Sequence, residues 1–159
     1  MTDHNAKDRL YLALYYRDGF PTDSQSEDRF HWALLNIPGA GHQATRFHAR
    51  DHFVGAEQTH WLYEEIHVPI ERTQKLLSRT YLGDVDNNER LLEIVRDVLI
   101  EQRDGWNCRS WVETAVALVW HEGLVDGGTT KELNGLKDEA LTAADTELAK
   151  KENTVKAML

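Results

Sequence analysis

The sequence predicts an α+β fold in which a small antiparallel sheet packs against helices. Short apolar and aromatic segments separated by turn residues occupy residues 10–85, as expected for strands. From residue 89 onward, apolar residues recur at helical spacing instead. Strands followed by helices are the order typical of α+β domains, and 159 residues are enough for a substantial core.

Five segments are predicted to be strands because they are apolar, aromatic or alternating and are bounded by turn residues. They are residues 10–16 (LYLALYY), 30–37 (FHWALLNI), 45–49 (TRFHA), 61–70 (WLYEEIHVPI) and 76–85 (LLSRTYLGDV). Residues 17–29 are polar and rich in turn formers, which indicates a surface loop, and residues 38–41 (PGAG) indicate a turn.

Three helices are predicted after the strands. The first has a start signal at residues 86–88 and an apolar stripe of Leu91, Leu92, Val95, Val98 and Leu99. The second begins near Cys108 and ends at Gly123, with a stripe of Trp111, Val112, Ala115, Leu118 and Val119. The third covers residues 130–157, is strongly charged, and either packs on the domain or pairs with a partner or a second copy. We therefore expect a domain at residues 9–125 and a helical extension at residues 130–157.

The composition disfavours several classes of function. The formal net charge is −9 and no basic cluster stands out, which disfavours nucleic acids and anionic membrane surfaces as partners. No apolar run approaches the roughly 20 residues needed to span a bilayer, and the first residues resemble no secretory signal. A single cysteine excludes an intramolecular disulfide. We expect a soluble, cytoplasmic protein.

The stretch GWNCRSWV, residues 105–112, holds that cysteine, Cys108. Asn107 is a good N-cap residue, which places Cys108 in the first turn of a helix. The positive end of the helix dipole and free N–H groups there favour a thiolate and an oxyanion. The spacing to Trp111 and Val112 also puts Cys108 on the core-facing side, and a lone cysteine is often only a packed residue.

A thiol nucleophile needs a base, usually a histidine. If residues 30–37 and 45–49 form a symmetric hairpin about the PGAG turn, His31 lies directly opposite His48, and both imidazoles share one face. One imidazole could then act as the base toward Cys108 while the other orients it. Trp32 should point to the opposite face.

The blocks HWALLN, RFHAR and NCRSWV together resemble the circularly permuted branch of the NlpC/P60 papain-like superfamily. In its lecithin:retinol acyltransferase-like members, a strand opens with H-W-[AG], a second His ends the next strand, and the nucleophile lies in an N-C-E-H-F-V helix start. PPPDE-type isopeptidases also place a His before an N-C-x-x-F helix start. The chain also looks like small, uncharacterised fungal proteins that carry H-W-A-L and W-N-C-x-x-W-V. By position, the resemblance makes Cys108 the nucleophile, His31 the base and His48 the orienting residue.

The resemblance has departures. Arg109, Ser110 and Trp111 replace Glu-His-Phe after the cysteine, and the segment between the two histidines is a few residues longer. A polar helix stands in place of the apolar membrane tail of the lipid acyltransferases, which favours soluble amides, peptides, thioesters or esters as substrates. The function expected is hydrolysis or acyl transfer through a thioester on Cys108, and the alternative is a catalytically inactive binding module.

Several other residues are candidates for roles near the same site. Trp106 could line an acyl pocket, and Tyr16 could provide a second oxyanion donor. Glu64 and Glu65 are expected to lie on a solvated strand edge, although one of them could face the cleft. Grouping His31 and His48 with Asp51 and His52 could suggest a metal site, but such spacings arise often by chance. We expect no metal and no cofactor.

Overall fold

The computed structural model describes residues 6–18, 26–53, 55, 59–71, 73–125 and 130–158 of the chain. Within this part, five strands form one sheet in which every neighbouring pair is antiparallel. The order across the sheet is β4-β3-β2-β1-β5. The strands are β1 (Asp8–Tyr16), β2 (Phe30–Ile37), β3 (Gln43–Phe53), β4 (Thr59–Pro69) and β5 (Leu76–Val85).

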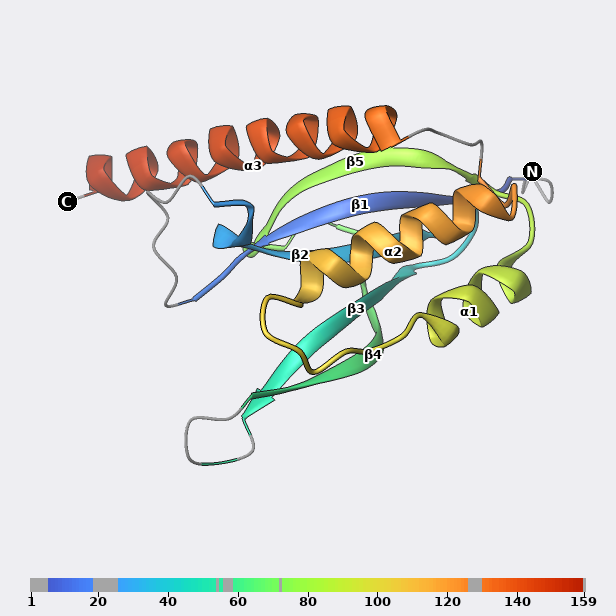
Figure 1. The fold of residues 1–159 in the computed structure, drawn as a ribbon. Helices are drawn as coiled ribbons and strands as arrows, with labels where there is room; N and C mark the ends of the chain where they lie inside the picture. Colours follow the sequence, from blue (N-terminus) through green and yellow to red (C-terminus); the bar gives the residue numbers. More distant parts are fainter. Residues whose placement is uncertain are drawn as a thin grey trace.

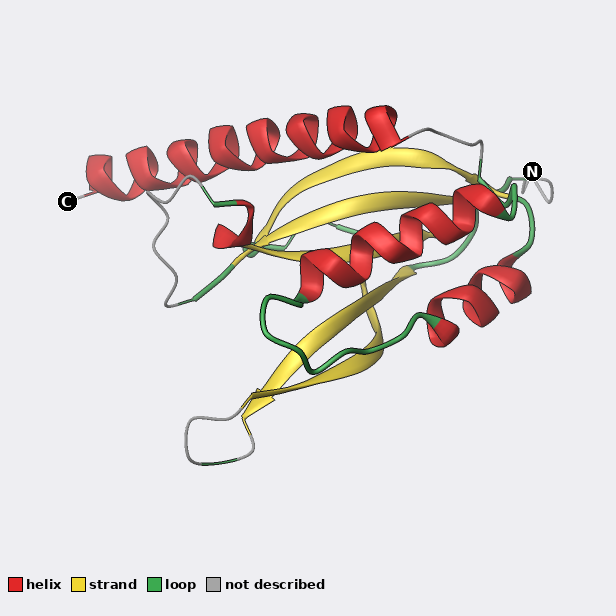
Figure 2. Ribbon diagram, in the orientation of Figure 1, coloured by secondary structure: helices red, strands yellow, loops and turns green. Residues whose placement is uncertain are grey.

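Helices cover one side of this sheet (Figure 1). Those in the described residues are the short 3-10 helix η1 (Glu27–Arg29), α1 (Asn88–Asp97), α2 (Cys108–His121) and α3 (Thr130–Met158). Figure 2 shows that the strands and helices form two layers, with α2 lying across the sheet and α3 running along β5. The predicted α+β class, with an antiparallel sheet packed on helices and a helix at residues 130–157, is confirmed.

The two faces of the sheet carry different side chains because successive residues of a strand point to opposite sides. Leu10, Leu12 and Leu14 of β1 point toward the helices and join the main core. Ala13 and Tyr15 point to the other face, where they form a smaller apolar cluster with residues of β2, β3 and β5. The helix-covered face therefore contains most of the buried apolar side chains.

The hairpin of β2 and β3 has a different register from the one expected. Leu34 pairs with Phe47 and Asn36 with Thr45, which centres the turn one residue later, between Ala40 and Gly41. Gly41 adopts a φ of 126°, which glycine accommodates without a steric penalty. The expected direct pairing of His31 with His48 is therefore wrong, because the turn is centred one residue later than the PGAG segment predicts. The shift is an even number of residues, so the two imidazoles still share a face.

The pairing between β2 and β3 is also short. It covers Leu34 to Asn36, although β2 begins at Phe30 and β3 continues to Phe53. In Figure 1, the hairpin of β3 and β4 turns away from the rest of the sheet beyond this pairing. The edge of β2 near Trp32 is therefore open to a group that comes from another element.

Both predicted helix starts are confirmed by their caps. Asn87 caps α1 by accepting a hydrogen bond from the Arg90 N–H. Asn107 caps α2 by accepting from the N–H groups of Arg109 and Ser110, and the Ser110 hydroxyl accepts from the Asn107 N–H. This reciprocal arrangement is a capping box.

The prediction that Leu118 and Leu99 belong to the buried stripes of their helices is wrong, because both side chains are exposed. Leu118 is 38% exposed, and Val116 is buried in its place because it lies one turn from both Val112 and Val119. Leu99 is 73% exposed because α1 ends at Asp97 and the helical spacing no longer applies beyond it.

Helix α3 packs on β5 and β1. Its buried residues Ala140, Ala144 and Leu148 belong to the same core as α1 and α2. Ser78 of β5 donates a hydrogen bond to the Ala140 carbonyl at 3.0 Å, and Arg29 forms an ion pair with Asp145 at 2.7 Å. The predicted extension thus packs on the domain.

In the parts of the chain that the structure describes, no helix combines the length and the apolar character required to cross a membrane.

Candidate functional site

Cys108 is the first residue of α2, so its thiol lies where the helix presents free N–H groups. The Trp32 N–H of β2 donates a hydrogen bond to Sγ at 3.5 Å. This amide belongs to the part of β2 that lies beyond the pairing with β3. The thiol therefore occupies the opening at the edge of β2, and the local departure of β3 makes room for it.

The thiol is buried and uncharged in this state. Cys108 is 3% exposed and belongs to the helix-side core. Burial raises the pKa of the thiol, while the N–H groups of Trp32 and Arg109 act in the opposite direction and only partly offset burial. The helix N-terminus by itself does not produce a resting thiolate here.

His31 and His48 are in direct contact. Nε2 of His31 lies 2.6 Å from Nδ1 of His48, and the two rings meet edge to face with centroids 4.8 Å apart. Nε2 of His48 lies 2.9 Å from Oε1 of Glu64, the residue directly opposite it on β4. Three side chains from three neighbouring strands thus form one hydrogen-bonded chain.

The direction of the hydrogen bonds follows from Glu64. Hydrogen bonding from His48 and the nearby Arg50 and Arg46 charges outweigh the effect of burial and lower the pKa of Glu64, so its carboxylate is an acceptor. His48 therefore donates from Nε2 and accepts at Nδ1. His31 must then donate from Nε2, which leaves its Nδ1 unprotonated. These proton positions are assigned from the network.

Both imidazoles are neutral at neutral pH. Burial, followed by the charges of His48, Arg46 and Arg17, lowers the pKa of His31 to about 3. Burial also lowers the pKa of His48, although the hydrogen bond to Glu64 opposes it. The lone pair at Nδ1 of His31 is free, but the lowered pKa makes it a weaker proton acceptor in the free protein than an ordinary imidazole.

The thiol and the imidazole pair approach β2 from different sides. His31 points to the open face, where its ring packs near Tyr15, while the Trp32 side chain points into the core that contains Cys108. In the described residues, the hydrogen bonds join His31 to His48, and Cys108 to the Trp32 amide, but none joins Cys108 to His31. Arg17 lies close enough to influence the pKa of both groups.

His31 lines a cleft of about 610 Å³ on the open face. Tyr16, Arg17 and Arg46 are among its other lining residues. The Tyr16 ring packs against the helix-side core, on the face of the sheet opposite to His31. Trp106 does not line this cleft. It is 4% exposed and its indole packs edge to face against Trp61, with centroids 5.8 Å apart.

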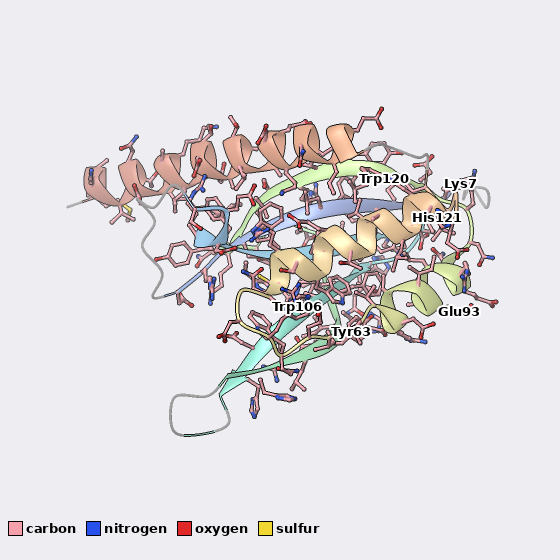
Figure 3. All side chains as sticks on the ribbon, viewed as in Figure 1. Lys7, Tyr63, Glu93, Trp106, Trp120 and His121 are labelled. Carbon is pink, nitrogen blue, oxygen red and sulfur yellow. The ribbon has the colours of Figure 1, made fainter. Side chains whose placement is uncertain are left out.

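Figure 3 shows Trp106 and Tyr63 beside the first turns of α2. The Tyr63 ring packs against Trp111 at a centroid distance of 5.7 Å. These aromatic residues fill the core beneath the helix that carries Cys108, and they hold its N-terminus against β3 and β4.

The sequence did not single out Glu64. The sequence favours a solvated edge for Glu64 and Glu65 and leaves open that one of them faces the cleft. Glu64 pairs with His48 and Arg50, and Glu65 pairs with Arg96 at 2.6 Å. The pattern that could have indicated Glu64 is its position on the strand after β3, but the register of β3 and β4 depends on a loop whose length the sequence does not reveal.

Asp51 and His52 do not join the histidine pair. Both are exposed near the end of β3. Across the residues that are described, no three His, Cys, Asp or Glu side chains are grouped so as to hold a metal ion.

The fold and site together define an α+β protein with a cysteine at a helix start and a histidine pair on adjacent strands. Residues 7–153 match the model of a family of unknown function (DUF6914), and the chain belongs to this family. The match includes Cys108, His31, His48, Glu64 and most of α3. No curated protein and no solved structure matches the chain.

Proposed function

We propose that this protein is a cysteine-dependent acyl-transfer enzyme of the circularly permuted NlpC/P60 type. Its substrate is a small or peptidic amide, thioester or ester. The observation that carries the proposal is the hydrogen-bonded chain from Glu64 through His48 to His31, because it leaves a neutral, unprotonated Nδ1 on His31. The thiol of Cys108 accepts a hydrogen bond from the N–H of Trp32, the residue that follows His31 on β2.

The reaction starts from a neutral thiol and a neutral imidazole. The Cys108 side chain turns from the Trp32 amide toward His31, and its proton passes to Nδ1 as Sγ attacks the acyl carbon. The leaving group takes that proton as its bond to the acyl carbon breaks, which gives a thioester on Cys108. Water, an amine or an alcohol then attacks the thioester, His31 accepts the proton, and the proton returns to Sγ.

His48 and Glu64 support His31 in this scheme. His48 holds the imidazole of His31 through Nε2, and the Glu64 carboxylate stabilises the positive charge that forms when Nδ1 is protonated. The Cys108 N–H at the start of α2 is a candidate donor to the oxyanion, and Tyr16, which packs against the same helix-side core as Cys108, is the candidate second donor.

A catalytically inactive binding module is the second candidate. The 3% exposure of Cys108 and the raised pKa of its thiol favour this alternative, because buried cysteines without a lowered pKa are inert. In that case the cleft beside His31 would hold a ligand without acyl transfer.

The two candidates differ in the chemistry of Cys108. We would measure its alkylation by iodoacetamide against pH in folded protein, and the acyl adduct formed with an activated ester by intact mass. An enzyme gives alkylation near neutral pH that His31→Gln and Glu64→Gln slow, and an adduct that Cys108→Ala removes. His121→Gln, an exposed histidine on α2, is the matched control.

The contrary result is equally clear. Suppose that the thiol is alkylated only as pH rises above the ordinary thiol pKa of about 9, and that His31→Gln, Glu64→Gln and His121→Gln are alkylated at the same rate. His31 then does not activate Cys108. GWNCRSWV is then a packing segment, and the binding module is the better description.

A further inference from the structure

Arg46 is an unusual cation on the open face of the sheet. It lies on β3 opposite Leu35 of β2 and Ile66 of β4, so its neighbours on both strands are apolar. Its Nε is buried and has no hydrogen-bond partner. A buried N–H without an acceptor is uncommon in proteins, and an N–H that belongs to a cation carries the larger penalty.

Two other arginines whose side chains are buried or partly buried have carboxylate partners. Arg29 pairs with Asp145, and Arg109 pairs with Asp28 and Glu113. No ion pair involves Arg46 within the described residues, and its guanidinium instead lies over the Tyr15 ring at 5.1 Å. The stacking fixes the plane of the guanidinium and leaves its charge without a counterion.

Three cations line the cleft, Arg17, Arg46 and Lys75, and of these it is Arg46 that has a buried N–H without an acceptor. Arg17 donates to the Asp28 carbonyl at 2.9 Å. Lys75 also lines the cleft, but it pairs with Asp18 at 2.7 Å. Arg50, two residues farther along β3, pairs with Glu64 at 2.9 Å. The Tyr15 hydroxyl is a further donor, since burial raises its pKa despite the charge of Arg46 and a hydrogen bond with it, so the two side chains already lie together.

We propose that Arg46, with the Tyr15 hydroxyl, binds a carboxylate of the acyl substrate in the cleft beside His31. The inference rests on the proposed function and adds a substrate class to it: acyl compounds that carry a second, negatively charged carboxylate. The rigid fork of a guanidinium matches the two oxygens of a carboxylate and is more selective for this geometry than an ammonium group. A protein with a net charge of −9 has little general attraction for anions, so such binding requires a local site.

A carboxylate bound at Arg46 would also change the pKa of His31, the proposed base. The Arg46 charge is one cause of the lowered pKa values of His31 and His48. A bound carboxylate neutralises that charge and raises both pKa values, which makes His31 a better proton acceptor in the complex than in the free protein.

The test measures succinate binding to the Cys108→Ser variant, by titration calorimetry and by the NMR shifts of the His31 and His48 rings. Arg46→Gln should weaken binding by at least about tenfold, as expected when a charged hydrogen-bonding partner is removed. The affinity of Arg46→Lys for succinate should lie between those of the parent protein and Arg46→Gln, because lysine keeps the charge but lacks the two-pronged guanidinium.

Arg79→Gln is the matched control. Arg79 lies over the Tyr11 ring at 5.5 Å but donates to the Ile70 carbonyl, so the same charge is removed from another stacked arginine. It should leave binding unchanged. Equal weakening by both variants, or no saturable binding by the parent protein, would overturn the proposal.

A parallel titration with inorganic phosphate separates the two kinds of oxyanion. Phosphate that binds more tightly than succinate would overturn the carboxylate assignment. Since the measurement uses protein without the thiol, it stands apart from the chemistry of Cys108. If succinate binding depends on Arg46 but the thiol of Cys108 proves inert, the carboxylate site is supported and the proposed acyl-transfer activity is rejected.

Discussion

The two faces of the sheet are built from the same strands but have opposite chemistry. The helix-covered face holds large apolar side chains, among them Trp32 and Leu12, each almost fully buried. The open face holds tyrosines, arginines and the histidine pair, with charges that lie over rings or in hydrogen-bonded chains. The comparison indicates that one face supplies most of the stability and the other carries the titratable groups.

Cys108 lies where the two faces meet. It belongs to the apolar core by burial and to the candidate site by its contact with the edge of β2. The short pairing of β2 with β3 is what allows this position. The mutations below test whether the faces have separate roles and whether the opening between β2 and β3 connects them.

The largest expected effect comes from the helix-covered face. Leu12 is 0% exposed, so Leu12→Ala should lower the free energy of unfolding by about 3 kcal/mol through lost burial and a cavity. Leu62, 38% exposed on the edge strand β4, is the matched position, and Leu62→Ala should cost about 1 kcal/mol or less. Urea unfolding monitored by tryptophan fluorescence measures both. Similar losses would show that the helix-covered face does not dominate the stability.

A smaller effect is expected from acid on the open face. His31 has an ordinary pKa of 6.5 in the unfolded chain and about 3 in the folded protein, so the unfolded state binds more protons between these values. Above pH 6.5, His31 is neutral in both states and does not oppose folding. As pH falls below 6.5, the unfolded chain binds a proton that the buried imidazole does not, so the free energy of unfolding decreases. From about pH 8 to about pH 5 the loss is roughly 2 kcal/mol, at about 1.4 kcal/mol per pKa unit.

Urea unfolding at several pH values measures this loss. His31→Gln should remove the part of the dependence due to His31 and leave the part due to His48, whose pKa is also lowered by burial. His121→Gln, at an exposed position on α2, should keep the whole dependence. The same pH dependence in both variants would mean that burial of His31 does not set the acid response.

The smallest effect concerns the position where the faces meet. Asn107→Ala and Asn87→Ala each remove a helix cap, and each should lower the free energy of unfolding by about 1 kcal/mol. Only Asn107→Ala frays the turn that holds Cys108, so it alone should speed alkylation of the buried thiol. If Asn87→Ala speeds alkylation equally, the thiol reacts through global opening of the fold.

The tertiary structure changed the expected site in two ways. The sequence placed His31 and His48 on one face because strand alternation has a fixed period, and this survived an error in the register. It did not reveal Glu64 or Arg46, because their roles depend on the pairing of β3 with β4 and on which charges lack partners. It also placed Trp106 toward a pocket, whereas the indole packs against Trp61.

By itself, the sequence determined the α+β class, the strand segments, the helix start at residues 86–88, the cap at Asn107, and the core-facing position of Cys108. These depend on local periodicity and capping chemistry, which act within a few residues. Only the tertiary structure decided the register of β2 and β3, the opening that receives the thiol, and the hydrogen-bonded chain that ends at Glu64. Those depend on loop geometry and on contacts between residues far apart in the chain, which local patterns do not encode.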